Sequence, residues 1–433
     1  MKRTSRCLLT TVALTVLVGP LTSGAFAQDP PVQKYLTDGR LTDGAAAMQV
    51  LLDDDPNDQQ ARFSLGVTQF LLAIEGLGRD HYRYGLLGER RPQITFLRLP
   101  IPENQTPEQI SYEKARGILQ NLVDRLTTAE QTLAKMSPKD VRLPLRVGQI
   151  RFDFDGDGKA SDEESLWSVM DTLQRPRRRE PAPATNNFSI TFDTGDVYWL
   201  RGYCHALSGL AEMVLAYDWH DQFDRTAHLF YPNVDTPYTY LAEEGPGFVS
   251  GFNTQNILDV ITLIHCINYE CTEPERMHRA LEHFEAVIAL GRLSWKAIEA
   301  ETDNDNEWIP NPDQESAAGG MRVGREMISR WHDLLDEIEA ILQGEKLVPF
   351  WRGVKGGIPM FINSPRDVPT HPELGINVRK IFTNPQRFDL ALWLQGTGLH
   401  PFLEKGDRTK GETWVEIADA FGDEFFLFLF WFN

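Results

Sequence analysis

The chain has 433 residues, 42% of them hydrophobic, and its 62 acidic and 43 basic residues give a formal net charge of −19 at pH 7. Nucleic-acid binding needs a positive surface that displaces counterions, so nucleic acid is not an expected partner. A chain of this length can bury the cores of two or three ordinary domains, so we expect it to fold without a stabilising ligand.

The first residues have the pattern of a signal peptide. Three basic residues within the first six precede an apolar run at residues 7–19, and Ala25-Phe26-Ala27 supplies the small residues of a cleavage site. The apolar run is too short to cross a bilayer. We therefore expect residues 1–27 to be removed and the protein to be periplasmic or secreted.

An N-terminal helical region is predicted for residues 28–136. Apolar periodicity predicts helices at residues 41–52, 58–76 and 107–135. Pro56 ends the first helix, and Asp58 is suited to cap the second. The stretch 51–73 resembles part of a tetratricopeptide helix pair, in which small residues pack against aromatic ones; the matching positions are Pro56, Ala61, Phe63, Leu65, Gly66, Phe70 and Ala73. This resemblance covers about one repeat and implies two stacked helices.

Residues 137–175 combine a strand, a loop and a helix. Apolar residues alternate with others at 141–147, which predicts a strand. One apolar stripe at 166–173 predicts a helix. Between them lies the acidic loop 153–164, which we expect to be the main chemical feature of the chain.

The spacing of loop 153–164 fits the oxygen ligands of a calcium ion. Ca²⁺ takes about six to eight oxygens, and EF-hand loops supply them at alternate positions. Here the ligands would be the carboxylates of Asp153, Asp155 and Asp157, the carbonyl of Lys159, the hydroxyl of Ser161 or a water that it holds, and the carboxylate of Glu164. Gly158 occupies the sixth position, where a side chain would obstruct the turn.

The loop therefore resembles the EF-hand family, and the resemblance implies Ca²⁺ as the cofactor. It covers residues 153–164 only. A predicted strand stands in place of the family's incoming helix, and we find no second loop of this spacing in the sequence. This favours an ion with a mainly structural role over a calcium sensor.

Residues 176–189 are rich in proline and arginine and are expected to form an exposed linker, although the arginines would also suit contact with an anion or a polymer. The rest of the chain, 190–433, is expected to be a C-terminal helical domain. Its predicted helices lie at residues 195–217, 253–269, 275–299 and 321–342, followed by a loop-rich segment at 348–385. Loops of this length are often where ligands bind.

The predicted helix 195–217 is apolar except for one narrow polar arc, formed by Arg201, His205, Ser208 and Glu212. Its apolar residues, Leu210 and Val214 among them, cover most of the remaining circumference, so we expect the helix to lie centrally, with these residues in the core. This arc faces either a strip of solvent, with its groups paired in a network, or an internal polar pocket. In a pocket, His205 and Glu212 would be the candidates for catalytic proton transfer or metal binding.

Three cysteines follow residue 27. Cys204 lies in an apolar helix and is expected to be a buried small residue, whereas Cys266 and Cys271 could form a disulfide in an exported protein. The apolar tail, 425–432, is expected to be buried in the core or to contact a partner or a membrane surface.

The predicted fold class is mainly α, a multi-helix array or bundle. Gly-x-Ser-x-Gly, His-Glu-x-x-His and Walker-loop motifs do not occur in the sequence. This favours a non-catalytic scaffold or a binding module for a protein or polymer, with structural calcium. The alternative is a calcium-supported, glycosidase-like hydrolase of an envelope or extracellular polymer, because glycosidases that use carboxylates leave no short motif.

Overall fold

The computed structural model describes residues 29–87, 99–137, 141–174, 189–243, 254–316, 323–352 and 374–422. The signal peptide predicted at 1–27, nearly all of the linker predicted at 176–189 and the apolar tail 425–432 lie outside the described residues.

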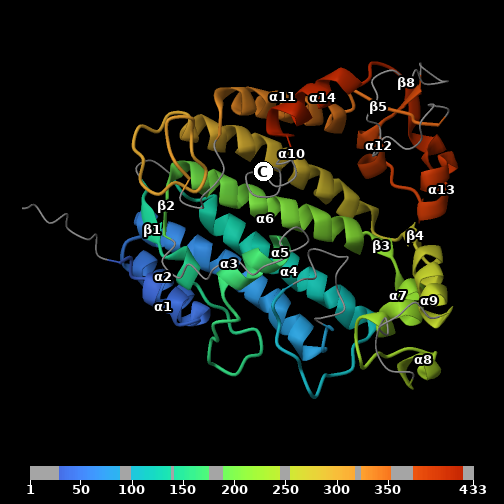
Figure 1. The fold of residues 1–433 in the computed structure, drawn as a ribbon, viewed down its shortest axis with the longest axis horizontal. Helices are drawn as coiled ribbons and strands as arrows, with labels where there is room; N and C mark the ends of the chain where they lie inside the picture. The colour runs from blue at the N-terminus through green and yellow to red at the C-terminus, as the bar shows by residue number, and fades with distance from the viewer. Residues whose placement is uncertain are drawn as a thin grey trace, which may run out of the picture.

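The protein is a mainly α-helical array, as predicted. Its long helices form a row in which each packs on the next: α2 (Leu41–Asp54), α3 (Gln59–Arg83), α4 (Tyr112–Leu133), α6 (Thr194–Leu215), α10 (Pro274–Ile298), α11 (Arg325–Leu342) and α14 (Gly411–Phe421). Figure 1 shows this row from α2 and α3 at the lower left to α11 and α14 at the top.

Side-chain caps fix the starts of α3 and α6. The Asp58 carboxylate accepts a hydrogen bond from the Ala61 N–H at 2.9 Å, as the sequence predicts for the start of α3. At the start of α6, Asp193 accepts from the Gly195 N–H at 2.8 Å, and Asp196 accepts from the Asp193 N–H at 2.9 Å. Both caps satisfy backbone donors that the first helical turn leaves unpaired.

Shorter elements fill the ends of the row. The helices are α1 (Gln33–Thr37), α5 (Leu166–Gln174), α7 (His220–Thr226), α8 (Thr239–Glu243), α9 (Thr254–His265), α12 (Val378–Thr383) and α13 (Leu390–Gln395), with 3₁₀ turns η2 (Val147–Gln149), η4 (Ala227–Leu229) and η6 (Thr397–Phe402). α5 and α9 lie where the sequence predicts helices.

The strands are short and all their pairings are antiparallel. β1 (Leu143–Leu145) pairs with β2 (Ile190–Phe192); β4 (Asn268–Cys271) lies between β3 (Tyr217–Asp218) and β7 (Phe388–Asp389); and β6 (Leu374–Ile376) lies between β5 (Val348–Pro349) and β8 (Leu403–Lys405). β1 covers only the centre of the strand predicted at 141–147, because the turn η2 follows it directly.

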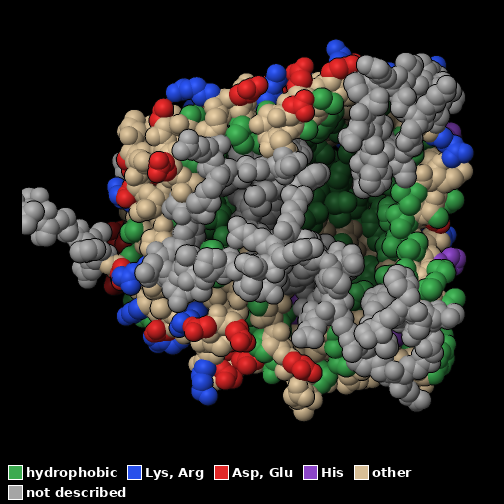
Figure 2. Space-filling model, in the orientation of Figure 1, with side chains coloured by type: hydrophobic (Ala, Val, Ile, Leu, Met, Phe, Trp, Pro, Cys, Tyr) green, Lys and Arg blue, Asp and Glu red, His purple; other side chains and the backbone are tan. Residues whose placement is uncertain are grey.

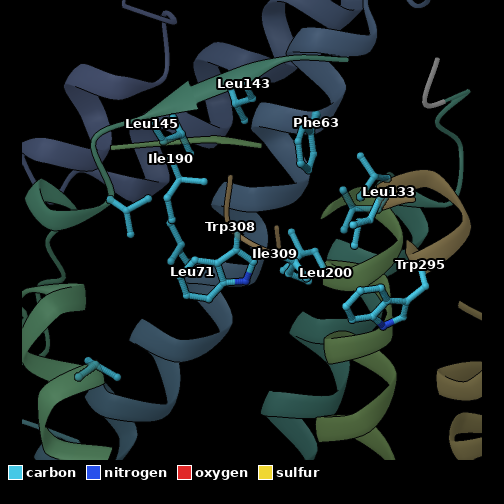
Figure 3. Packing of buried hydrophobic residues seen from close by; sticks show 14 of the residues in the cluster. Phe63, Leu71, Leu133, Leu143, Leu145, Ile190, Leu200, Trp295, Trp308 and Ile309 are labelled. Carbon is cyan, nitrogen blue, oxygen red and sulfur yellow. The ribbon is translucent and has the colours of Figure 1, made fainter. Parts of the chain in front are cut away.

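The largest hydrophobic core draws on segments that are far apart in the chain. Figure 3 shows side chains from the long helices, from β1 and β2, and from the segment after α10 gathered in one interior: Phe63, Leu71, Leu133, Leu143, Leu145, Ile190, Leu200, Trp295, Trp308 and Ile309. The β1–β2 pair thus joins the α2–α3 pair to α6.

The described cysteines are all free thiols. Cys204 is 1% exposed within α6, which confirms the prediction of a buried small residue. The disulfide considered for Cys266 and Cys271 is not formed. No helix among the described residues is both long enough and apolar enough to cross a membrane.

Apolar side chains also remain on the surface. Figure 2 shows hydrophobic groups on the side of the molecule where α9 and α13 lie. The exposed large residues of these helices are Ile257, Leu258, Val260, Ile261 and Ile264 of α9 and Leu392 and Leu394 of α13. In α6, Leu210 and Val214 are 57% and 47% exposed, which corrects the expectation that the apolar circumference of this helix is buried.

Candidate metal centre

The acidic loop 153–164 is anchored by two phenylalanines. Phe152 and Phe154 are fully buried, and their rings stack with centroids 5.0 Å apart. Alternation along an extended segment directs their neighbours Asp153 and Asp155 away from the rings. Phe154 lies against Gly78 of α3, where a Cβ would come within 2.2 Å of the ring, so only glycine allows this approach.

Three of the predicted ligands converge. Carboxylate oxygens of Asp153, Asp155 and Glu164 lie within 4.8 Å of one another. Asp153 is 7% exposed and Glu164 is 2% exposed, so two of the three carboxylates are removed from water. Ionised groups brought this close and this deep repel one another unless a cation or protons compensate them.

The Oδ1 atom of Asp153 shows that these residues fit a cation. It is buried and has no hydrogen-bond partner among the described residues. A buried polar atom without a partner costs about 1–3 kcal/mol, and more when it is charged. An oxygen-seeking dication bound at this point would satisfy it.

Glu164 closes the loop through hydrogen bonds at both ends. Its Oε1 accepts from the Phe154 N–H at 2.8 Å and its Oε2 from the Ser161 N–H at 3.1 Å. Its backbone carbonyl accepts from the Phe152 N–H at 2.7 Å. The residue predicted to be the closing ligand therefore holds the first and ninth ligand positions close together.

The other predicted ligands lie on the exposed side of the loop. Asp157, Lys159 and Ser161 are exposed, and Asp157 is not part of the converging carboxylate group. Asp155 Oδ1 accepts from the Asp157 N–H at 3.0 Å, and Asp157 Oδ1 accepts from the Lys159 N–H at 2.7 Å. Gly158 has a φ of +78°, the conformation expected at the sixth position.

Sequence reasoning missed two residues of this centre, Glu75 and Arg79 of α3. Glu75 Oε2 accepts from the Asp153 N–H at 3.0 Å. The Arg79 guanidinium donates to the Asp153 carbonyl and to its Oδ2, both at 2.7 Å, and lies 3.2 Å from Glu75. A Glu and an Arg four residues apart indicate an ion pair on a helix, but nothing in their spacing indicates a partner 74 residues further on.

Burial has an electrostatic consequence for Glu75. This carboxyl is 2% exposed, and burial raises its pKa. The hydrogen bond from the Asp153 N–H and the charge of Arg79 oppose that rise, whereas Asp153 and Glu164 add to it. The centre is therefore rich in negative charge, with Arg79 as the cation that faces Asp153.

A second carboxylate group lies where α6 starts. Oxygens of Asp193, Glu301 and Glu307 lie within 4.8 Å of one another, and all three residues line a cavity of about 580 Å³. Burial, together with the charge of Asp193, raises the pKa of Glu301 to about 9 and that of Glu307 to about 7. Nothing in the sequence indicates this group, because Asp193 lies more than 100 residues before Glu301 and Glu307.

The polar arc of α6 faces α4 and α10. Arg201 donates to Glu130 of α4 at 2.9 Å. The Nδ1 atoms of His205 and of His283 in α10 are 2.8 Å apart, so one ring donates the hydrogen bond and the other accepts it. Burial, and to a lesser extent the neighbouring His205, lowers the pKa of His283.

Glu212, the other catalytic candidate on this arc, is 3% exposed and lies between Arg276 and Arg279 of α10, at 2.9 and 3.1 Å. Burial alone would raise its pKa, but hydrogen bonds from Arg279 and Arg276 outweigh burial and lower the pKa. The arrangement corresponds to the alternative of a paired network, because His205 and Glu212 are each paired with side chains of a neighbouring helix.

The chain was compared with protein-family models, with curated proteins and with solved structures, and none of these comparisons found a match.

Proposed function

We propose that the protein is an exported, calcium-binding helical scaffold or binding module in which calcium stabilises the central segment. The observation that carries this proposal is the unpartnered, buried Oδ1 of Asp153 beside the carboxylates of Asp155 and Glu164. These atoms lie in a loop whose spacing matches that of an EF-hand, and hard oxygen ligands of this kind select calcium.

The site is expected to bind weakly. A solitary calcium loop in an extracellular protein typically has a Kd of about 10⁻⁴ to 10⁻³ M. The outward position of Asp157, Lys159 and Ser161 agrees with this range, because these ligands would have to be gathered when the ion binds.

Calorimetric titration with calcium tests the proposal. We expect a heat of binding at millimolar calcium for the native protein and a large loss of affinity for Glu164→Gln and Asp153→Ala. Glu163→Gln is the matched control, because Glu163 is the exposed neighbour and has no predicted ligand role. The absence of any binding heat in the native protein would overturn the calcium proposal.

A hydrolase remains the second candidate because of the cavity near Asp193. Catalytic carboxyls work as acid and base when their surroundings push their pKa values apart, and the raised pKa of Glu301 keeps a proton available at neutral pH. The described lining of the cavity contains no aromatic side chain on which a sugar ring could stack, so this candidate ranks second.

Hydrolysis of envelope and extracellular polysaccharides by the native protein and by Glu301→Gln would test this candidate. Activity in the native protein that is lost in Glu301→Gln would favour the hydrolase. Equal activity in both proteins would remove Glu301 from consideration.

A further inference from the structure

The loop lacks one element of an EF-hand, the helix that directly precedes it in the sequence. In an EF-hand a helix precedes the loop and holds its first ligand. Here β1 and the turn η2 precede the loop instead. The groups that surround the first ligand, Asp153, come from α3, which lies more than 70 residues earlier in the chain.

α3 holds three of the four polar groups of Asp153. The Asp153 N–H donates to Glu75, the Asp153 carbonyl accepts from Arg79 Nε, and Asp153 Oδ2 accepts from Arg79 Nη2. The remaining group is Oδ1, the buried oxygen without a partner. The contacts with α3 therefore fix the orientation of the carboxylate and leave Oδ1 without a hydrogen bond, and a carboxylate oxygen of Asp153 lies within 4.8 Å of oxygens of Asp155 and Glu164.

We propose that α3 takes the place of the missing helix and that Arg79 and Glu75 are positioning residues, which orient Asp153 Oδ1 toward the calcium ion. This inference rests on the proposed calcium site. Groups that orient metal ligands typically change metal affinity by about 10–100-fold when they are mutated. Arg79 is suited to the role because its planar guanidinium donates hydrogen bonds to the Asp153 carbonyl and to its carboxylate at the same time.

Arg79 has two opposing effects on calcium binding: its hydrogen bonds orient Asp153, and its positive charge repels the ion. A guanidinium next to a calcium ligand repels the ion, so Arg79→Ala would remove both the repulsion and the orientation of Asp153. Arg79→Lys separates the two effects, because lysine keeps the charge and loses the planar guanidinium. Glu75→Gln keeps an oxygen that can accept from the Asp153 N–H and removes one negative charge.

Calcium titration of the native protein, Arg79→Lys and Glu75→Gln tests the inference. We expect Arg79→Lys to lower calcium affinity by about 10-fold or more, and Glu75→Gln to lower it less, through charge alone. Arg125→Lys is the matched control. The side chain of Arg125, on α4, is 40% exposed, compared with 44% for Arg79, and it pairs with Asp80 of α3, the helix that also carries Arg79. Native affinity in Arg79→Lys would overturn the inference.

A second measurement distinguishes positioning from general loss of structure. Terbium(III) can replace calcium in oxygen sites, and its luminescence lifetime in H₂O and D₂O counts the waters bound to it. If Arg79 orients Asp153, the ion in Arg79→Lys binds an additional water where Oδ1 has turned away. Unchanged hydration would overturn the positioning role even if affinity fell. Absence of calcium binding in the native protein would instead defeat the calcium site itself.

Discussion

A buried carboxylate oxygen can be compensated by a hydrogen bond, by a proton or by a cation, and three buried carboxyls of this protein differ in the compensation open to them. Glu212 is compensated by the hydrogen bonds of two arginines. Glu301 keeps its proton, because burial and Asp193 raise its pKa to about 9. Asp153 Oδ1 has no hydrogen-bond partner among the described residues, which is why we propose a cation there.

The raised pKa of Glu301 predicts how stability depends on pH. In the unfolded chain this carboxyl loses its proton near pH 4.5, whereas the folded protein holds it up to about pH 9. Stability contributed by the protonated form is therefore lost progressively as the pH rises through this window. We expect Glu301→Gln to melt about 2 °C higher than the native protein at pH 8, and at the same temperature at pH 4, by calorimetry in EDTA. A lower melting temperature at pH 8 would contradict this account.

The ion pairs of Glu212 and Asp336 provide a matched test of burial. Glu212→Gln leaves Arg276, with a side chain only 14% exposed, without its buried carboxylate, so we expect a loss of about 3 kcal/mol in the free energy of unfolding. Asp336→Asn breaks a pair with Arg292 at a carboxylate that is 73% exposed, and the expected loss is below about 1 kcal/mol. Urea denaturation measures both; equal losses would show that burial does not govern these pairs.

At the scale of elements, the packing of α3 against the loop depends on Gly78. A Cβ at this position would come within 2.2 Å of the Phe154 ring, so we expect Gly78→Ala to shift the loop, to cost about 1–3 kcal/mol of stability and to weaken calcium binding. Gly117→Ala in α4 is the control, because no atom lies within 4 Å of the added Cβ. There alanine should stabilise the helix by about 1 kcal/mol. Thermal melting and calcium titration would measure both variants.

The sequence predicted the long helices other than α14, and the spacing of the acidic loop, because their signals are local. The polar arc of α6 shows what local signals do not predict, namely which residues its side chains contact. Periodicity identified Arg201, His205 and Glu212 as neighbours on one face, but their partners lie on α4 and α10. Periodicity also placed Leu210 and Val214 in the core, and they are exposed because no described element covers that face. Which neighbour covers a helix face is decided by tertiary packing, and a single sequence does not show it.

The same limit applies to the candidate site. The ligand spacing of residues 153–164 is visible in the sequence, because an EF-hand loop takes its ligands from one short segment. Glu75 and Arg79 were not visible, because the fold brings α3 to the loop. The carboxylates of Asp193, Glu301 and Glu307 were missed for the same reason. Sites formed by one segment can be predicted from a sequence, whereas sites formed by several segments require the fold.

At the scale of the whole molecule, the acidic loop 153–164 joins segments that are distant in sequence. The Arg151 N–H, just before the loop, donates to the Leu36 carbonyl at 3.0 Å, and the Leu166 N–H, just after it, donates to the Ile150 carbonyl at 2.9 Å. With the contacts to α3, an ion here would tie the N-terminal helices to α5. An ion that binds the folded loop and not the unfolded chain would add its binding free energy to stability.

The net charge of −19 makes a nonspecific effect of calcium the main competing explanation, because any salt screens repulsion between acidic groups. Site binding and screening differ in saturation and in specificity. At a calcium concentration 100 times the Kd, we expect stabilisation of about 2.7 kcal/mol, measured as a rise in melting temperature above that in sodium chloride of equal ionic strength. Asp153→Ala should respond to calcium only as it responds to sodium chloride. If the native protein and this variant gain equally from calcium, screening accounts for the effect and the loop does not tie the helices together through an ion.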